Sequence, residues 1–166
     1  MPNIQRYFLE TNSKLDLIPA ECGIVNLTIE ESDKKDPQFC KFLYQKIGED
    51  FHWKDRLAWN LKEWENYLNQ SKLKFFIAKV GEDVAGFYEY LNHEDKREVE
   101  ISYFGIFKEY FGKRLGGYLL THALRSGWSH NPNRIWVHTC TLDHPHALRN
   151  YIARGMNVFK KEKVRV

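Results

Sequence analysis

The chain has 166 residues, which suits one domain of ordinary size. Its 43% of apolar residues and 28% of charged residues are typical of a soluble globular protein, and they exclude a disordered or collagen-like chain. The 25 Lys and Arg residues against 22 Asp and Glu residues give a net charge of +3, so composition provides no electrostatic argument for nucleic acid as a partner.

The sequence shows no membrane span and no secretion signal, and it predicts a cytoplasmic protein. No stretch approaches the roughly 18–20 apolar residues that a membrane span requires, so no membrane partner is expected. The start, Met1–Arg6, has no basic stretch followed by an apolar run and does not resemble a secretion signal. Three widely spaced cysteines, Cys22, Cys40 and Cys140, favour reduced thiols in a cytoplasmic protein over a disulfide framework.

The N-terminal part of the chain alternates predicted strands and helices. Residues 5–10 and 23–30 are expected strands. In the second, positions 24, 26 and 28 alternate with the apolar positions 25, 27 and 29, which is typical of a half-buried strand. The polar turn 32–37 begins a helix whose apolar residues keep a helical spacing up to Gly48. The same spacing predicts a second helix over residues 55–68.

The remainder of the chain predicts a mixed sheet. The predicted strands are residues 73–80, 84–91, 98–107, 134–141 and 157–162, and the predicted helices are residues 112–128 and 145–154. The strand–helix–strand segment 98–141 normally gives two neighbouring parallel strands through a right-handed crossover, whereas the segment 73–91 reads as an antiparallel hairpin. The fold class is therefore α/β or α+β, with helices on both faces of the sheet.

The turn between the strand 98–107 and its helix carries the first functional signal. Three closely spaced glycines let a ligand approach the backbone, the first-turn N–H groups of the helix lack intrahelical partners, and basic side chains add positive charge. These residues are Gly112, Gly116, Gly117, Lys108, Lys113 and Arg114. Such a turn is typical of a phosphate cradle, and is as often purely structural; it matches neither a P-loop nor the dinucleotide glycine pattern.

At this turn the chain resembles the GNAT superfamily of acyl-CoA-dependent N-acyltransferases. The phosphate signature of that family, Gln/Arg-x-x-Gly-x-Gly/Ala, falls on residues 111–116 when it is aligned on Gly116. Phe111 stands where the family has Gln or Arg, and Arg114 stands where it has the first glycine. In the family this loop binds phosphate mainly through backbone N–H groups, so these changes do not by themselves abolish binding; the Arg114 guanidinium either crowds the pyrophosphate or helps to hold it.

A second signature of the family lies on the last predicted helix. The family has Asn-x-x-Ala-x-x-x-Tyr-x-x-x-Gly-Phe, and the corresponding residues here are His144, Ala147, Tyr151, Gly155 and Met156. Positions 144, 147 and 151 lie along one helix face. The resemblance makes Tyr151 the general acid for the leaving thiolate, and we expect this transfer, from a pKa of about 10 to one of about 8.5, to run downhill. The alternative is a core tyrosine on an amphipathic helix.

The resemblance implies a fold and an activity. The fold is a twisted, mostly antiparallel sheet with one parallel strand pair, in a single domain over residues 1–166 with its core at about 23–162. The activity is that of an N-acetyltransferase, which moves an acetyl group from acetyl-CoA to a primary amine by direct attack and needs no metal. The residues that the resemblance assigns to acetyl-CoA are Gly105, Ile106, Phe111, Gly112, Lys113, Arg114, Leu115, Gly116, Gly117 and His144. A non-catalytic acyl-CoA sensor or structural module is the alternative.

A base is also required, because a charged ammonium cannot attack a thioester. Glu100, on the strand that leads into the phosphate turn, matches the glutamate that some family members use directly or through water. Glu98 on the same face, water, and a purely solvent-facing Glu100 remain alternatives. In the family the pantetheine arm pairs with the strand backbone around Gly105 and Ile106, where an N–H group often holds the thioester oxygen.

One cluster of side chains raises the alternative of a metal site. His138, Cys140, Asp143, His144 and His146 are all ligand types, and His138 and Cys140 share a strand face. Their spacing matches no standard zinc pattern, and histidines two residues apart cannot share a helical face, so no metal is predicted. Cys140 is more simply a small buried strand residue than a nucleophile.

The acceptor site is expected near the first two helices, because that region often lines it in the family. The candidates are Phe51, His52, Trp53 and Asp55, whereas Trp59 and above all Trp64 are expected to pack the core. The sequence leaves the acceptor open between polyamines, amino acids, antibiotics and protein amines. The chain also has room for one strand after its last helix where the family commonly has two, so residues 5–10, or a partner chain in a homodimer, should cover the exposed sheet edge.

Overall fold

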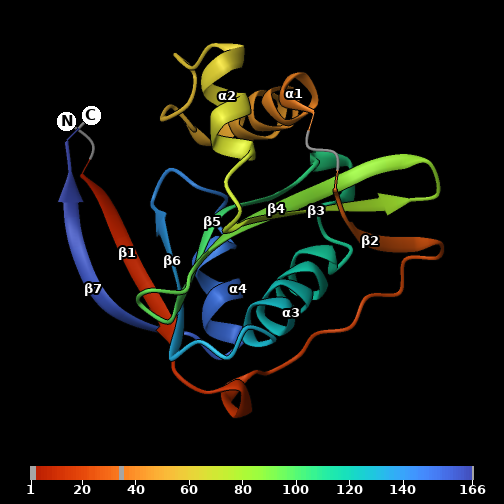
Figure 1. Cartoon of the computed structure of the whole chain (residues 1–166). Coiled ribbons are helices and arrows are strands. Elements are labelled where there is room, and N and C mark those ends of the chain that lie inside the picture. The colour runs from red at the N-terminus through yellow and green to blue at the C-terminus, as the bar shows by residue number, and fades with distance from the viewer. Residues whose placement is uncertain (1–2, 34–35, 166) are drawn as a thin grey trace.

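A single seven-stranded sheet forms the centre of the molecule, and the computed structural model describes residues 3–33 and 36–165 of the chain. The strands are β1 (Ile4–Thr11), β2 (Leu27–Glu31), β3 (Leu73–Val80), β4 (Asp83–His93), β5 (Glu98–Ile106), β6 (Arg134–Cys140) and β7 (Asn157–Val164). The helices are α1 (Pro37–Gly48), α2 (Leu61–Leu68), α3 (Leu115–Trp128) and α4 (Ala147–Ala153). The strands follow the order β2-β3-β4-β5-β6-β1-β7 across the sheet (Figure 1).

The only parallel pair among the described strands is β5 with β6, which α3 connects. This confirms the predicted fold class, a mostly antiparallel mixed sheet with one parallel pair. The pairing is short, because it joins only Glu98–Ile101 of β5 to Arg134–Val137 of β6. Beyond these residues both strands continue but no longer pair with each other, so the sheet divides there.

The sheet buries a separate apolar core on each face. Helices α1 and α2 cover one face and α3 and α4 cover the other, as predicted (Figure 1). Leu119 of α3 packs with Ile101 and Val137 in the first core, and Leu43 of α1 packs with Trp64 of α2 in the second. Trp64 is 1% exposed, which confirms its predicted place in the core.

Strand β1 lies between β6 and β7 and is antiparallel to both. The expectation that residues 5–10 cover the edge of β6 is therefore confirmed. Because β1 passes beside the divided part of the sheet, Arg6 lies opposite Cys140 at the end of β6. Ile4 pairs with Val164, so the start of β1 and the end of β7 lie side by side at one tip of the sheet (Figure 1).

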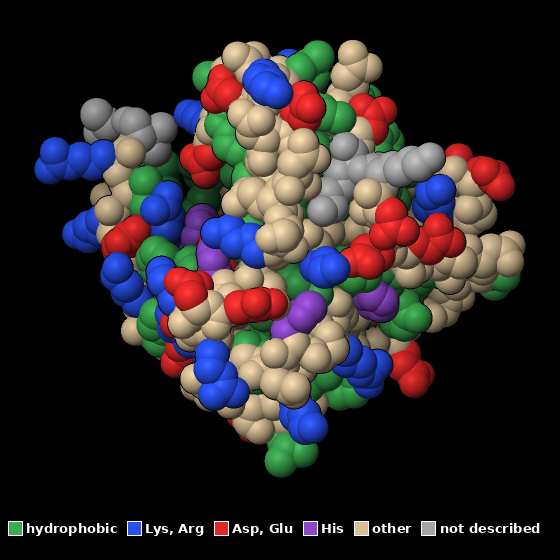
Figure 2. Space-filling model, viewed as in Figure 1, with side chains coloured by type: hydrophobic (Ala, Val, Ile, Leu, Met, Phe, Trp, Pro, Cys, Tyr) green, Lys and Arg blue, Asp and Glu red, His purple; other side chains and the backbone are tan. Residues whose placement is uncertain are grey.

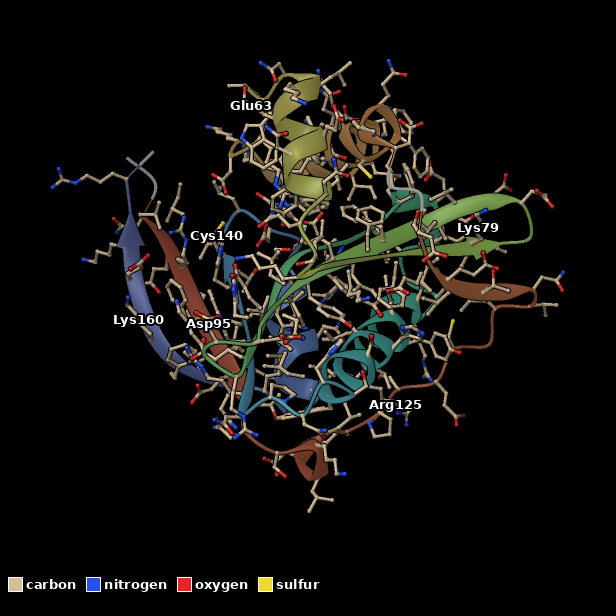
Figure 3. The ribbon with its side chains drawn as sticks, in the orientation of Figure 1. Glu63, Lys79, Asp95, Arg125, Cys140 and Lys160 are labelled. Carbon is tan, nitrogen blue, oxygen red and sulfur yellow. The ribbon has the colours of Figure 1, made fainter. Side chains whose placement is uncertain are left out.

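Strand β7 forms the outer edge of the sheet and is rich in lysine. Lys160, Lys161 and Lys163 follow one another closely along it, and Lys and Arg side chains gather on this side of the molecule (Figure 2). Lys160 projects at the outside of β7, whereas Cys140 lies further in, at the end of β6 (Figure 3). Charged lysines on an edge strand disfavour pairing with another sheet.

The first predicted helix is correct, and the second begins later than expected. Asp36 caps α1 by accepting a hydrogen bond from the Gln38 N–H group at 2.9 Å, and Pro37 occupies the first turn. Lys34 and Lys35 of the predicted turn lie outside the described residues. The helix predicted over 55–68 begins only at Leu61, because a capping box formed by Asn60 and Glu63 starts it there.

The prediction for 112–128 is also wrong at its start. Gly112 and Arg114 have φ angles of +77° and +66°, which a right-handed helix does not permit, so α3 begins at Leu115. A similar turn at Asn26, with φ of +62°, delays the strand predicted over 23–30 until Leu27.

The helix predicted over 145–154 begins at Ala147, so Pro145 precedes the helix instead of occupying its first turn. None of the helices in residues 3–33 and 36–165 has the length and apolar character of a membrane span.

Candidate active site

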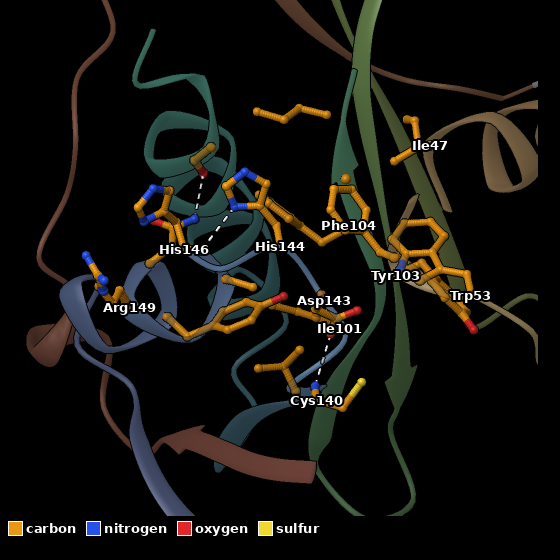
Figure 4. Close-up of a pocket in the computed structure, with 18 of the residues that line it drawn as sticks. Ile47, Trp53, Ile101, Tyr103, Phe104, Cys140, Asp143, His144, His146 and Arg149 are labelled. Atoms are coloured by element: carbon orange, nitrogen blue, oxygen red, sulfur yellow. Dashed lines mark hydrogen bonds between the residues drawn. The ribbon is translucent and has the colours of Figure 1, made fainter. Parts of the chain in front are cut away.

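A cavity of about 470 Å³ lies where β5 and β6 separate. This volume falls within the usual range for small-molecule and cofactor sites. Trp53 and Tyr103 form one side of the cavity, and His144, His146 and Arg149 lie on the opposite side, at and just before α4 (Figure 4). The division of the sheet thus produces a pocket that both predicted signatures line.

The start of α3 forms one end of the cavity. The lining includes Phe111, Gly112, Arg114, Leu115, Gly116 and Gly117 from the predicted phosphate turn. Since the first N–H groups of a helix have no intrahelical partner, those of the first turn of α3 are available donors beside the cavity. Lys113 does not line the cavity; its ammonium lies 5.6 Å from the centre of the Tyr110 ring.

Positive charge exceeds negative charge around the cavity. The charged lining residues are Arg6, Lys54, Arg114 and Arg149 against Asp55 and Asp143. An excess of arginine and lysine beside free N–H groups suits a phosphorylated ligand. Of these side chains, Arg114 lies next to the start of α3, so that end of the cavity has the chemistry that suits phosphate.

Strand β5 forms the wall between the two ends of the cavity. Ser102 to Ile106 have no strand partner on the side that faces β6, although β4 pairs with residues 103–106 on the other side. Gly105 and Ile106, both predicted to contact pantetheine, line the cavity there. Packing also requires glycine at position 105, because a Cβ atom would lie 2.6 Å from Ile47 and 3.0 Å from Trp53.

Tyr151 of α4 lines the cavity and is 6% exposed. Its ring meets that of Phe104 edge-on at 6.4 Å, and its hydroxyl makes no hydrogen bond to another described residue. The hydroxyl is therefore available to a ligand.

The acidity of Tyr151 differs from the sequence-based expectation. Burial, and then the negative charge of Asp143, raise the pKa of Tyr151 above its usual value. The expectation of a downhill proton transfer is wrong, because the phenol is a weaker acid than a thiol even at the reference values and burial widens the gap. A protonated Tyr151 can instead donate a hydrogen bond to sulfur as negative charge develops on it.

His144 belongs to an aromatic cluster at the cavity wall. Its ring lies 4.6 Å from that of Phe111 and 5.7 Å from that of Phe51, both edge-on. Its Nδ1 atom accepts a hydrogen bond from the backbone N–H group of His146 at 3.0 Å. Burial, and then the charge of His146, lower the pKa of His144, so both observations favour the neutral imidazole.

The two carboxylates considered as bases lie outside the lining of the cavity. Glu100 contacts Nε2 of His93 at 3.0 Å, and Glu98 contacts Nε of Arg134 at 3.1 Å. His138 lines the cavity, and against the larger effect of burial, which lowers the pKa of His138, the negative charge of Glu100 acts to raise it. The Glu100 carboxylate therefore lies near the cavity without forming its wall. The role of Glu100 stays a prediction.

All four acceptor-site candidates, residues 51–53 and Asp55, line the cavity. The ring of Trp53 lies 4.9 Å from that of Tyr103, and the Tyr103 hydroxyl donates a hydrogen bond to Asp55 Oδ2 at 3.2 Å. Trp59 packs against Trp64 at 5.2 Å, away from the lining. The cavity therefore has a second end, with aromatic walls and a carboxylate.

The cluster considered as a metal site has other partners. Asp143 accepts hydrogen bonds from Thr139 Oγ1 at 2.5 Å and from the Cys140 N–H group at 3.1 Å. In the part of the chain that the structure describes, no three His, Cys, Asp or Glu side chains gather to hold a metal ion. Burial, and then the charge of Asp143, raise the pKa of the Cys140 thiol, which disfavours a nucleophilic thiolate.

Sequence reasoning missed several polar residues that line the cavity, among them Arg6, Arg149 and Asn150. Arg6 arrives from the other end of the chain through the pairing of β1 with β6, which no local pattern predicts. Arg149 and Asn150 directly precede Tyr151 of the second signature, and only their position on the predicted helix could have indicated that they line the cavity. Asn150 Nδ2 donates a hydrogen bond to the carbonyl oxygen of Gly116 at 3.1 Å and so ties α4 to the start of α3.

The divided mixed sheet, the start of α3 at one end of the cavity and the tyrosine beside the gap agree with the fold that the resemblance predicted. The acetyltransferase (GNAT) family matches residues 38–156. The match covers more than half of the chain, and the chain belongs to this family. A search of curated proteins found no match.

Solved structures share the fold at low sequence identity. A GCN5-related N-acetyltransferase from Sphaerobacter thermophilus superposes with a TM-score of 0.76 and 12% identity over 98% of this chain and 51% of that chain. Spermidine N-acetyltransferase from Vibrio cholerae, in complex with CoA and spermine, superposes with a TM-score of 0.63 and 19% identity, over 78% of this chain and 80% of that chain. An aminoglycoside acetyltransferase from an uncultured soil metagenomic sample superposes with a TM-score of 0.63 and 16% identity, over 78% of this chain and 87% of that chain. The present chain spans about half the length of the Sphaerobacter protein.

Proposed function

We propose that this protein transfers an acyl group, most simply acetyl, from acyl-CoA to a primary amine. The observation that carries the proposal is the cavity itself, which joins the free donors at the start of α3 to the unpaired edge of β5, Tyr151 and the aromatic end near Trp53. A CoA thioester held by its diphosphate at α3 would run along β5 and present its carbonyl near Tyr151. Membership of the acetyltransferase family supports the same reading.

The proposed reaction is a direct displacement. The lone pair of a neutral amine attacks the thioester carbon, the C–N bond forms, and the C–S bond breaks with its electron pair on sulfur. The amine nitrogen loses one proton and the thiolate gains one, so protons balance overall. Tyr151 donates a hydrogen bond to the departing sulfur and keeps its proton, and the thiolate takes its proton from solvent.

Glu100 is the proposed acceptor of the amine proton. Because its carboxylate does not line the cavity, we assign the transfer to water that links it to the cavity beside His138. Glu100→Gln should lower turnover most at pH values where the acceptor is mainly protonated. Glu98→Gln is the matched control, and a Glu100→Gln enzyme with the wild-type pH–rate profile would remove Glu100 from the mechanism.

Two measurements test the proposal. Acetyl-CoA should raise the melting temperature of the protein, and a panel of amines should then release free CoA. Tyr151→Phe should lower kcat by roughly tenfold to a thousandfold with little change in acetyl-CoA affinity, whereas Tyr118→Phe, on α3 and outside the cavity lining, should change neither. Tight binding of acetyl-CoA without turnover of any amine would instead favour the non-catalytic acyl-CoA module.

A further inference from the structure

A buried ion pair lies outside the cavity, between the loop of residues 52–60 and strand β4. The Arg56 guanidinium contacts the Glu89 carboxylate through two hydrogen bonds, Nη2 to Oε1 at 2.6 Å and Nη1 to Oε2 at 3.2 Å. The two side chains are 6% and 1% exposed. This pair is therefore almost completely removed from water.

Aromatic side chains surround the pair and complete its hydrogen bonds. The Arg56 guanidinium lies 4.1 Å from the centre of the Tyr67 ring and 4.4 Å from that of Tyr103. The Tyr67 hydroxyl donates a hydrogen bond to Glu89 Oε1 at 2.6 Å. Because burial of two charges cancels much of their attraction, a pair of this kind gives little stability compared with apolar side chains of similar volume. Stability alone therefore does not account for it.

The Glu89 carboxylate also holds the irregular part of β5. Glu89 pairs with Tyr103 while its neighbour Tyr90 pairs with Ile101, so Ser102 is an extra residue in β5 and forms a β-bulge. Ser102 Oγ donates a hydrogen bond to Glu89 Oε1 at 3.0 Å. Ser102 and Tyr103 both line the cavity, so the carboxylate fixes a segment of its wall from behind.

Arg56 fixes the facing segment of the cavity. Residues 53–55 line the cavity and directly precede Arg56, whose backbone N–H group donates to the Tyr44 hydroxyl at 3.1 Å. Asp55 in turn accepts the hydrogen bond of the Tyr103 hydroxyl. The ion pair thus links the loop and the bulge, which are the two parts of the aromatic end, and it makes no contact with the start of α3.

We propose that Arg56 and Glu89 are positioning residues that hold residues 53–55 against the β5 bulge and so shape the acceptor end of the cavity. The kinetic part of this inference rests on the proposed acyltransferase function. Neither side chain lines the cavity, so both act through the loop and the bulge. The acyl-CoA end should be independent of them.

The test separates position from stability. In the double variant Arg56→Met with Glu89→Leu, apolar contacts replace the ion pair, and we expect the urea midpoint to stay at or above that of the wild type. The loop loses its polar links, so amide hydrogen exchange of residues 53–59 should accelerate at least roughly tenfold, and kcat/KM for the acceptor should fall roughly tenfold to a hundredfold. The Kd for acetyl-CoA should stay within about twofold.

Two further variants keep the test decisive. Tyr67→Phe removes one hydrogen bond to Glu89 and should show the same pattern in milder form, even where the double variant fails to fold. Glu10→Gln is the control, because it breaks the Arg134–Glu10 contact of 2.8 Å outside the cavity lining and should leave loop exchange and acceptor kinetics unchanged.

Unchanged loop exchange in the Tyr67→Phe and double variants would overturn the inference, and so would an equal loss of acetyl-CoA affinity. A wild-type protein that transfers no acyl group would refute the proposed function alone. The exchange comparison would then still decide whether the ion pair positions the loop.

Discussion

Arg114→Gly is expected to change stability and ligand affinity in opposite directions. Arg114 precedes α3 with φ of +66°, in the left-handed region where a residue with a Cβ atom is strained by about 1–2 kcal/mol. Glycine removes this strain but adds about 0.5–1 kcal/mol of chain entropy to the unfolded state. The central values of these two effects differ by about 0.75 kcal/mol in favour of glycine, which corresponds to a rise in Tm of roughly 2–3 °C for a chain of this length.

The same substitution removes a cation from the phosphate end of the cavity. Arg114 lines the cavity and forms no salt bridge with another described residue, so its guanidinium is free to contact a phosphate. A hydrogen bond to a charged group contributes about 1.5–3 kcal/mol. We therefore expect acetyl-CoA to bind roughly tenfold to a hundredfold more weakly, in calorimetric titrations at constant ionic strength.

Arg114→Ala separates the two effects. Alanine removes the guanidinium but keeps the Cβ atom, so affinity should fall as it does in the glycine variant while Tm should not rise. Equal or tighter binding of acetyl-CoA by Arg114→Gly would show that the arginine crowds the phosphates and would refute this reasoning. An unchanged Tm in the absence of ligand would refute the assignment of strain.

Three further outcomes are expected. Gly105→Ala should lower stability in urea unfolding by about 1–3 kcal/mol, because the new methyl group meets Ile47 and Trp53; an unchanged midpoint would contradict the packing. Burial lowers the pKa of His144 on folding, so the unfolded state binds protons more readily than the folded state. The contribution of His144 to stability is therefore present above about pH 6.5 and is lost as pH falls. The free energy of unfolding of His144→Asn should depend less steeply on pH between pH 5 and 8. The Kd for acetyl-CoA should rise with salt, since the cations that line the cavity are partly exposed.

Local chemistry explains which elements the sequence predicts well. The strand predicted over 73–80 matches β3 to the residue, because its composition and the turn that follows act within the strand itself. The start of the helix predicted over 55–68 failed because apolar spacing continues through Leu57, which is 52% exposed in the structure. The loop there is held by the ion pair of Arg56 with Glu89, a contact across 33 positions that no local window contains.

The same distinction applies to the site. The phosphate turn and Tyr151 carry spacing signals within single elements, so the sequence located them, and the cavity contains both. Glu100 was chosen by its place on β5, but side-chain partners are set by neighbouring strands, and β4 supplies His93 as its partner. Periodicity assigns a residue to a face of a sheet and does not report which group across the sheet it contacts.

The first strand connects the fold to the chemistry of the cavity. It covers the edge of β6, beside the gap that the proposed function requires to stay open. The pairing joins residues 6–11 of β1 to residues 135–140 of β6, including the part of β6 that no longer pairs with β5, and so supports that part from the outside. The same pairing brings Arg6 to the cavity wall, where its guanidinium contacts the Glu162 carboxylate of β7 at 3.2 Å. The N-terminal strand therefore covers the edge of β6 and places a cavity-lining residue through one set of backbone hydrogen bonds.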